Sequence, residues 1–208
     1  SLQNGFVEWD DTGMFADNPH FRGLAWENIR WMFTTFHYAH YHPVTWLTLG
    51  LDYKLSGLNP QAFHRTSLLI HAANAVLCFW LVRALLRTAG QAREVSSAWM
   101  PCCAAGALVF ALHPLRVESV AWATERRDVV SGFFYLLTLL CYVRAQTGEV
   151  RRKTLWMAAA LACFILSFLS KAWGITLPVV LLVLDAHPLR RIRTDGRLTP
   201  QIMALLRE

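Results

Sequence analysis

The stretch HPLRVESVAWATERRD, residues 113–128, lies between two apolar stretches of the kind that cross membranes, residues 99–112 and 129–142. It carries charges of both signs at close spacing, directly beside segments that we expect to lie in lipid. Charged side chains at such a depth are costly unless they face a protein interior or a water-filled cavity. The stretch therefore predicts a membrane helix bundle with a polar site at one membrane face.

The composition agrees with a polytopic membrane protein. Of the 208 residues, 55% are hydrophobic, and the mean hydropathy is +0.32. Only 16% are charged, whereas soluble domains have about 25%. Apolar runs occupy residues 67–86, 99–112, 129–142, 155–170 and 174–184. Flanking residues extend each run toward the roughly 20 residues that a membrane span needs. The runs therefore predict an all-α bundle of about five spans. We expect residues 59–190 to form this bundle.

The net charge of +6 follows a topological pattern and does not indicate a nucleic-acid partner. Segments 83–97, 144–153 and 185–208 hold twelve of the twenty Lys and Arg but five of the fourteen Asp and Glu. By the positive-inside rule these segments face the cytoplasm. Residues 191–208 are accordingly predicted to form a cytoplasmic segment, and residues 113–128 and the site that they carry to face the other side.

Residues 1–58 are predicted to form a long non-cytoplasmic loop with two short amphipathic helices. Trp26, Ile29, Phe33 and Phe36 recur at helical spacing, and so do Val44, Leu47, Leu51 and Leu55. Pro43 suits the first turn of the second helix and Gly57 its end. The aromatic content favours two helices lying in the membrane interface, and a soluble two-helix cap is the alternative.

A polar stripe follows one face of the helix that Asn59 and Pro60 are expected to begin. Lipid does not accept such a stripe, so it is predicted to face the bundle interior; its members are His64, Ser67, His71 and Asn74. We interpret Ser67 and Asn74 as hydrogen-bonding residues between helices, and His64 as either that or part of a site.

Two groups of charged residues are candidates for chemistry. In the acidic pair Asp10-Asp11, one carboxylate is a candidate general base and the other a ligand for substrate or a metal, although such pairs are common in solvated loops. Basic residues suited to phosphate are Arg116, Arg126, Arg127 and Lys171, set among the carboxylates Glu118, Glu125 and Asp128. The structural alternative is a network of ion pairs that holds the loop, for example between Glu125 and Arg127.

The histidines and cysteines do not predict a metal site. His37, His40 and His42 match no standard zinc spacing, and the five cysteines include no CxxC pair. No cofactor is expected, and a divalent metal at the acidic pair is the alternative. The candidate substrate-lining residues are His42, His64, His113, Glu118, Glu125 and Asp128.

Ten short motifs occur in an order that resembles one known family. They are FVEWDD (6–11), FADNPH (15–20), HPVTW (42–46), GLNP (57–60), HAAN (71–74), ALHP (111–114), VESVAW (117–122), ERRD (125–128), SK (170–171) and LP (177–178). The series is similar to that of the transmembrane and tetratricopeptide repeat-containing O-mannosyltransferases and their bacterial relatives, which look like membrane glycosyltransferases of the GT-C fold.

The resemblance implies a reaction. Such enzymes take a sugar, mannose or another hexose, from a polyprenyl-phosphate-linked donor and transfer it to Ser/Thr hydroxyls of a protein acceptor at the non-cytoplasmic face. It assigns the catalytic carboxylate to Asp10 or Asp11 and the carrier phosphate to Arg126, Arg127 and Lys171. It also implies an integral protein of a bacterial inner membrane or an ER membrane. The family's first span and its tetratricopeptide repeats are absent from this chain, so we expect it to be a fragment.

Two other functions remain open at this point. A transporter also needs polar stripes and buried charge, but inverted repeats and interrupted helices are not evident, apart from Pro178. A non-catalytic membrane anchor for a repeat domain would need no donor site. Binding of a lipid-linked donor distinguishes the enzyme from both.

Overall fold

The computed structural model describes residues 3–90 and 97–192, and within them every regular element is helical. The predicted all-α class is thus confirmed. Residues 193–208 of the expected cytoplasmic segment lie outside the described part. The elements in chain order are η1 (Thr12–Ala16), α1 (Trp26–Thr34), α2 (Pro43–Ser56), α3 (Pro60–Ala89), η2 (Ser97–Trp99), α4 (Met100–Leu112), η3 (Pro114–Arg116), α5 (Val117–Ala121), α6 (Arg126–Thr147), η4 (Val150–Arg152), α7 (Lys153–Phe168), η5 (Ala172–Thr176) and α8 (Leu177–Ala186).

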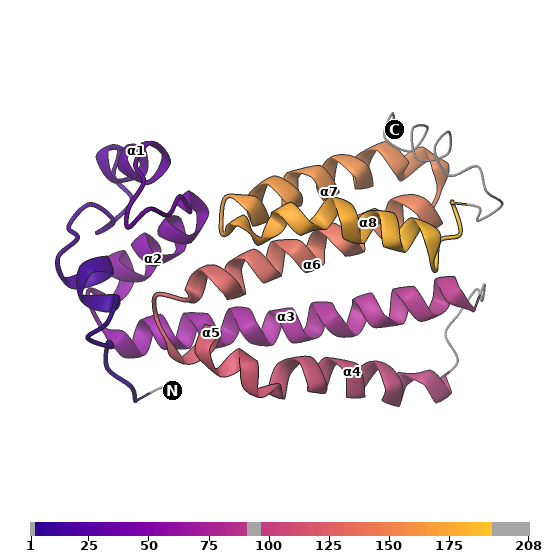
Figure 1. Ribbon diagram of the computed structural model, residues 1–208, viewed down its shortest axis with the longest axis horizontal. Helices are drawn as coiled ribbons and strands as arrows, with labels where there is room; N and C mark the ends of the chain where they lie inside the picture. Colours follow the sequence, from indigo (N-terminus) through magenta and orange to yellow (C-terminus); the bar gives the residue numbers. More distant parts are fainter. Residues whose placement is uncertain (1–2, 91–96, 193–208) are drawn as a thin grey trace.

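The long helices lie side by side as a bundle, with α3 and α6 in its middle (Figure 1). Helix α3 packs against α4 on one side and α6 on the other, and α6 packs against α7 and α8. The side chain of Asn59 accepts a hydrogen bond from the Gln61 amide at 3.0 Å, which begins α3 where the Asn-Pro pair predicts.

Two helices, α3 and α6, are long and apolar enough to cross a membrane. The pair formed by α4 and η3–α5 passes the same test as one span, bent by 53° after Leu112. Helix α7 has 16 residues, or about 24 Å at 1.5 Å per residue, and α8 is shorter still. All five predicted runs therefore form bundle helices, but two of them are shorter than the roughly 30 Å hydrocarbon layer.

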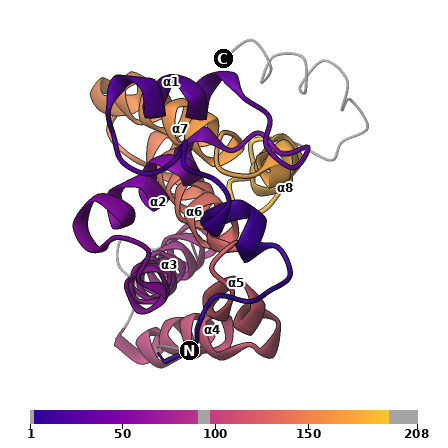
Figure 2. The same ribbon diagram turned by 90° about the vertical axis from the view of Figure 1, so that its left-hand side faces the viewer.

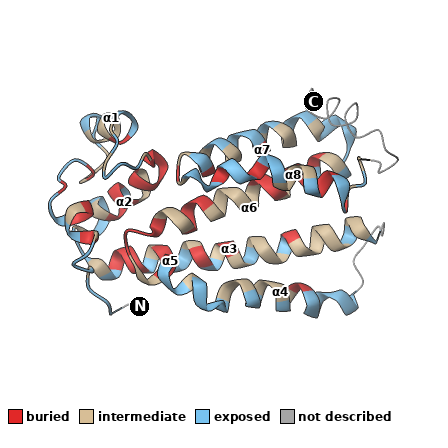
Figure 3. Ribbon diagram, viewed as in Figure 1, coloured by how far each residue is buried: buried red, intermediate tan, exposed pale blue. Residues whose placement is uncertain are grey.

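The polar stripe of α3 faces the bundle interior, as predicted. Its four members are all buried, whereas Leu69 and Val76 on other faces of the helix are 70% and 57% exposed (Figure 3). The Asn74 amide donates to the Val129 carbonyl at 2.9 Å, and the His71 ring bonds the Ala111 carbonyl at 3.0 Å. The predicted role of Asn74 between helices is confirmed.

Elements η1, α1 and α2 form a cap over one end of the bundle (Figure 2). Both predicted amphipathic helices are present, and members of both predicted apolar stripes are exposed, among them Trp26 and Phe33 of α1, at 75% and 40%. Trp46 and Leu49 are buried, whereas the predicted stripe members Leu51 and Leu55 are 45% and 73% exposed. The cap core is aromatic and contains Met14, Phe15, Phe21, Met32, Trp46, Leu49 and Phe63.

The cap, the bent segment after α4 and the connection between α7 and α8 all lie at the same end of the bundle (Figure 1). Thr45 Oγ1 donates to the Ser170 carbonyl at 3.0 Å, and the Val44 amide donates to the Leu169 carbonyl at 3.3 Å. The segments that the charge pattern assigns to one side of the membrane are thus joined at one end.

Candidate functional site

A cluster of ion pairs lies where α6 begins. Arg127 Nε donates to Glu125 Oε1 at 3.0 Å, and Lys171 Nζ lies 2.9 Å from Glu125 Oε2. Lys171 also pairs with Asp128, whose other oxygen accepts from Ser119 Oγ at 3.1 Å. Four of the predicted site residues therefore meet, and the ion pairs considered as the structural alternative are present.

The charges of this cluster balance one another. Burial raises the pKa of Glu125, but hydrogen bonds from Arg127 and Lys171 outweigh it and hold that pKa below its ordinary value. Glu125 is therefore ionised at neutral pH. The two carboxylates of Glu125 and Asp128 face two cations, so the cluster has no net charge. An anionic ligand therefore needs a further cation to attract it.

Arg116 provides an uncompensated cation beside this cluster. Its guanidinium stacks over the Phe110 ring at 4.7 Å from the centroid. Among residues 3–90 and 97–192 it has no carboxylate partner. A half-buried guanidinium without a counter-ion attracts phosphate, which it can bind through two parallel hydrogen bonds.

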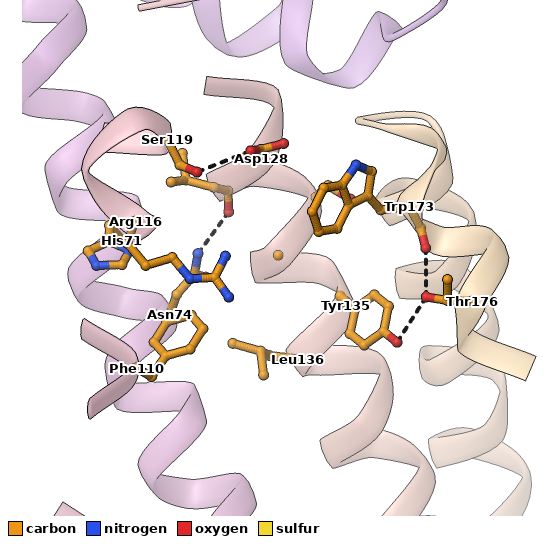
Figure 4. Close-up of a pocket in the computed structure, with 13 residues that line it drawn as sticks. His71, Asn74, Phe110, Arg116, Ser119, Asp128, Tyr135, Leu136, Trp173 and Thr176 are labelled. Atoms are coloured by element: carbon orange, nitrogen blue, oxygen red, sulfur yellow. Dashed lines mark hydrogen bonds between the residues drawn. The ribbon is translucent and has the colours of Figure 1, made fainter. Parts of the chain in front are cut away.

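Two adjoining cavities share Arg116, Phe110, Ser119, Asp128 and Trp173 as lining residues. The outer cavity, about 600 Å³, brings together predicted residues from three segments; it is also lined by Val109, His113, Leu115, Glu118, Glu125 and Lys171. The inner cavity, about 320 Å³, extends between α3 and α6 and is also lined by His71, Asn74, Val129, Ser131, Gly132, Tyr135, Leu136 and Thr176. In Figure 4, Arg116 reaches from one wall of the inner cavity, and Trp173 and Tyr135 lie across it.

Arg126 lies apart from both cavities. It is fully buried, and its Nη1 forms a 2.5 Å ion pair with Asp52 of α2. Its Nε donates to Ser67 Oγ at 3.2 Å, and its Nη2 donates to the Phe63 carbonyl. All three guanidinium nitrogens are thus satisfied inside the protein, so Arg126 joins α2, α3 and α6, and phosphate has no access to it.

The two acidic residues of the predicted catalytic pair differ sharply. Asp11 is fully buried and accepts from the Val7 amide at 2.8 Å and from Thr124 Oγ1 at 2.5 Å. The Thr124 amide donates to the same oxygen at 3.2 Å. Asp10 is half-buried, and within the described residues its carboxylate has no hydrogen-bonding partner. Asp11 bonds Thr124, the residue before the cavity-lining Glu125, but the pair lines neither cavity.

The predicted substrate-lining histidines occupy three environments. His113 is exposed, lines the outer cavity and accepts from the Leu115 amide at 3.3 Å. His42 is buried against Trp46, and burial, followed by the charge of Arg127, lowers its pKa to about 3. The side chain of His64 is buried, and its Nε2 lies 3.5 Å from the Gly5 carbonyl oxygen. Neither His42 nor His64 lines a cavity, and the described residues contain no group of three metal-ligating side chains.

Several lining residues were not predicted from the sequence. Trp173 forms one wall of both cavities and also stacks on Lys171 Nζ, 5.1 Å from its ring centroid. The sequence signal that could have predicted Trp173 as a lining residue is its position two residues after Lys171. Phe110 and Tyr135 lie in apolar runs, where an aromatic ring of a cavity wall cannot be told from an ordinary lipid-facing or packed one.

Comparison with known proteins gives the chain its relatives. The protein O-mannosyl-transferase TMTC2 of Mus musculus is 32% identical over 155 residues, which are 74% of this chain and 17% of that protein. This chain belongs to the TMTC protein O-mannosyl-transferase family. TMTC4 of Mus musculus and TMTC3 of Homo sapiens are each 28% identical, over 85% of this chain.

The TMTC matches cover 17–26% of the length of these relatives, so most of each relative lies outside the comparison. No protein-family model matches the chain, and no solved structure matches it either. The names of these relatives describe transfer of mannose to protein.

Proposed function

We propose that this chain forms the donor-binding face of a membrane protein O-mannosyltransferase. It transfers mannose, or another hexose, from a polyprenyl-phosphate-linked donor to Ser/Thr hydroxyls of a protein acceptor at the non-cytoplasmic side. The observation that carries the proposal is the uncompensated Arg116 at the junction of a polar outer cavity and a mainly apolar inner cavity. A polyprenyl phosphate has an anionic phosphate at the end of an apolar chain, so its phosphate matches Arg116 and its chain matches the apolar inner cavity.

The donor phosphate lies between Arg116 and Lys171 in this proposal. Arg116 is free to form paired hydrogen bonds with it, and Lys171 already lies within reach of the same cavity. The developing negative charge on the leaving phosphate is stabilised by these cations in a site from which water is partly excluded. The sugar extends outward, toward the cap and Asp10.

Asp10 is the proposed general base, because its carboxylate is accessible and free of partners, whereas that of Asp11 is fully engaged. The acceptor oxygen attacks C1 of the sugar as Asp10 takes the hydroxyl proton. The bond from C1 to the phosphate oxygen breaks with its electron pair, and polyprenyl phosphate leaves. One displacement inverts C1. Asp11 holds residue 124, and through it the start of α6, in place.

The base assignment is tested in the full-length protein with polyprenyl-phosphate mannose and a Ser/Thr acceptor peptide. Asp10→Asn removes the proton acceptor and should lower kcat about 100-fold or more without changing the melting temperature. Asp11→Asn should lower the melting temperature as well, because it weakens the bonds to Thr124. Undiminished transfer by both variants would exclude the pair from catalysis.

The phosphate assignment is tested by binding of the same donor. Arg116→Ala should weaken donor binding about tenfold or more, the loss expected for a charge-assisted hydrogen bond. Arg65→Ala is the matched control, because Arg65 is an exposed α3 residue outside both cavities. Equal binding by the wild type and Arg116→Ala would favour a membrane anchor or a transporter with another substrate.

A further inference from the structure

The loop between α1 and α2 ends in a strained hairpin, residues His37 to His40. The two residues exchange both backbone hydrogen bonds, at 3.0 and 2.9 Å. Between them Tyr38 and Ala39 have φ values of 50° and 60°. This is the geometry of a type I′ turn, which normally takes Asn-Gly. Left-handed backbone is unfavourable at residues with side chains, so surrounding contacts must hold the turn.

Contacts on two sides hold it. On one side the His37 ring bonds the Gly13 carbonyl at 3.3 Å, and a side chain at Gly13 would sit 1.9 Å from the Tyr38 hydroxyl. Gly13 follows the acidic pair by two residues. On the other side α2 is bonded to Ser170, the residue before Lys171, through Thr45. The hairpin is therefore bonded to the segment that follows Asp10, and α2, which begins three residues after the hairpin, is bonded to the segment of Lys171.

His40 is the histidine of this hairpin whose side chain is left free. His42 is buried on Trp46, and His37 contacts both Trp31 and Trp46. The His40 ring is exposed, and within residues 3–90 and 97–192 its nitrogens form no hydrogen bond. Its ring lies 6.2 Å from that of His42. The charged groups that act on it come from three segments: Asp10, Glu125, Arg127 and Lys171.

We infer that His40 binds substrate, and that its imidazole hydrogen-bonds a hydroxyl group of the transferred sugar or of the acceptor. The inference rests on the proposed function, which places both hydroxyl-bearing partners between Asp10 and the cations of the outer cavity. His40 lines neither cavity, but the charges of Asp10, Arg127 and Lys171 all act on it, and both of its ring nitrogens are available. Packing does not explain a histidine at position 40, because its side chain is exposed.

The protonation state of His40 suits this role. Although His40 is exposed overall, desolvation of the covered part of its ring, followed by the charge of Arg127, lowers its pKa below the ordinary 6.5, against the opposing effect of Glu125. At pH 7 the ring is therefore neutral, and it offers one N–H donor and one acceptor nitrogen, the pair that a hydroxyl group can use. Below that pKa the ring becomes a cation and loses its acceptor.

The test uses the full-length protein, with His40→Ala, His40→Gln and the control His20→Ala. His20 is an exposed cap histidine stacked on Trp31 at 5.4 Å. We expect His40→Ala to lower kcat/KM about tenfold at pH 7.5 with an unchanged melting temperature, and His40→Gln, which keeps a donor and an acceptor, to recover most of it. His20→Ala should keep wild-type kinetics.

Two further readouts identify the bound hydroxyl. A rise in KM for the acceptor peptide alone would place His40 on the acceptor, and a rise for the lipid-linked donor alone would place it on the sugar. The wild-type loss of kcat/KM toward acid pH should move to lower pH in His40→Gln, because Gln does not titrate. Wild-type kinetics and pH profile in His40→Ala would overturn the inference while leaving the proposed function intact; absence of transfer by the wild type would instead reject the proposed function.

Discussion

At the scale of single residues, neighbours in this chain have opposite environments. Asp11 is buried with three hydrogen bonds, whereas Asp10 beside it is accessible. Arg126 is buried with its charge paired to Asp52, whereas Arg127 pairs with Glu125 at the rim of the outer cavity. In each pair one residue builds the scaffold and the other remains near the site. Substitutions within a pair should therefore have different consequences.

Breaking the Arg126–Asp52 pair should destabilise the protein severely. Asp52→Ala leaves a buried guanidinium without its counter-ion, and such losses cost about 3–5 kcal/mol. Thermal unfolding of the detergent-solubilised protein measures the effect. Glu149→Ala is the control, because its 3.9 Å contact with Arg152 is solvent-exposed and should contribute little. Similar melting temperatures for the two variants would contradict a structural role for Arg126.

His42 should make the stability of the cap depend on pH. Its folded-state pKa, about 3, lies below the unfolded value of about 6.5. Between these values the unfolded chain binds an extra proton, so its contribution is complete above about pH 6.5 and falls by about 1.4 kcal/mol per pH unit as the pH drops toward 3. We expect His42→Phe to reduce the slope of melting temperature against pH in this window. An unchanged slope would show that His42 titrates normally.

At the scale of elements, the cap depends on close approach of backbones. Gly50 of α2 lies so near the preceding loop that a Cβ would meet the Gly23 carbonyl oxygen at 2.7 Å and the Phe21 carbonyl oxygen at 3.0 Å. This contact lets Trp46 and Leu49 enter the aromatic core. The aliphatic stripe members Leu51 and Leu55 stay exposed on another face of α2.

Gly50→Ala should therefore loosen the cap. The obstacle is backbone rather than a flexible side chain, so we expect a loss of about 1–3 kcal/mol, the usual range for overpacking. Gly5→Ala is the control, since a Cβ there would meet nothing within 4 Å. The melting temperatures of the two variants are compared. A Gly50→Ala protein as stable as Gly5→Ala would mean that the loop shifts without strain.

At the scale of the whole molecule, the cap and the bent segment after α4 share one end of the bundle, and the C-terminal ends of α3 and α6, which belong to the predicted cytoplasmic segments, lie toward the other (Figure 1). The bundle spans the distance between them with α3 and α6. This arrangement predicts opposite accessibility for the two ends in a membrane.

Single cysteines test that arrangement in a variant whose native cysteines are replaced by alanine. Glu27→Cys lies exposed on α1 of the cap, and Glu149→Cys lies exposed before α7. In intact cells or sealed vesicles, a membrane-impermeant maleimide should label residue 27 from the non-cytoplasmic side and residue 149 only after permeabilisation. Labelling of both from one side would contradict the topology.

The sequence predicts much of the fold because its signals are local. Pro43, Pro60 and Gly57 mark helix ends, and the inward stripe of α3 follows from spacing alone. The local part of the ion-pair cluster was also predictable, since Glu125, Arg127 and Asp128 lie within four residues of one another, whereas Lys171 comes from 43 residues later. The fate of Arg126 was not, because successive helix positions point about 100° apart and the acceptor, Asp52, comes from a helix 74 residues earlier.

The bond between Asp11 and Thr124 was likewise beyond prediction, because it joins residues 113 positions apart. Periodicity reports which face of a helix is apolar, but not which distant segment covers it. The cavities depend on the same long-range placement. Their aromatic walls, Phe110 and Tyr135, come from different helices.

The distant partners of the cap also set a sequence of events during biosynthesis. Asp11 and Thr45 are synthesised before their partners, Thr124 and the Ser170 carbonyl. A nascent chain that lacks these partners cannot seat its cap. The cap end of the bundle is consequently completed only after α7 has emerged from the ribosome, so shorter translation intermediates should lack a seated cap.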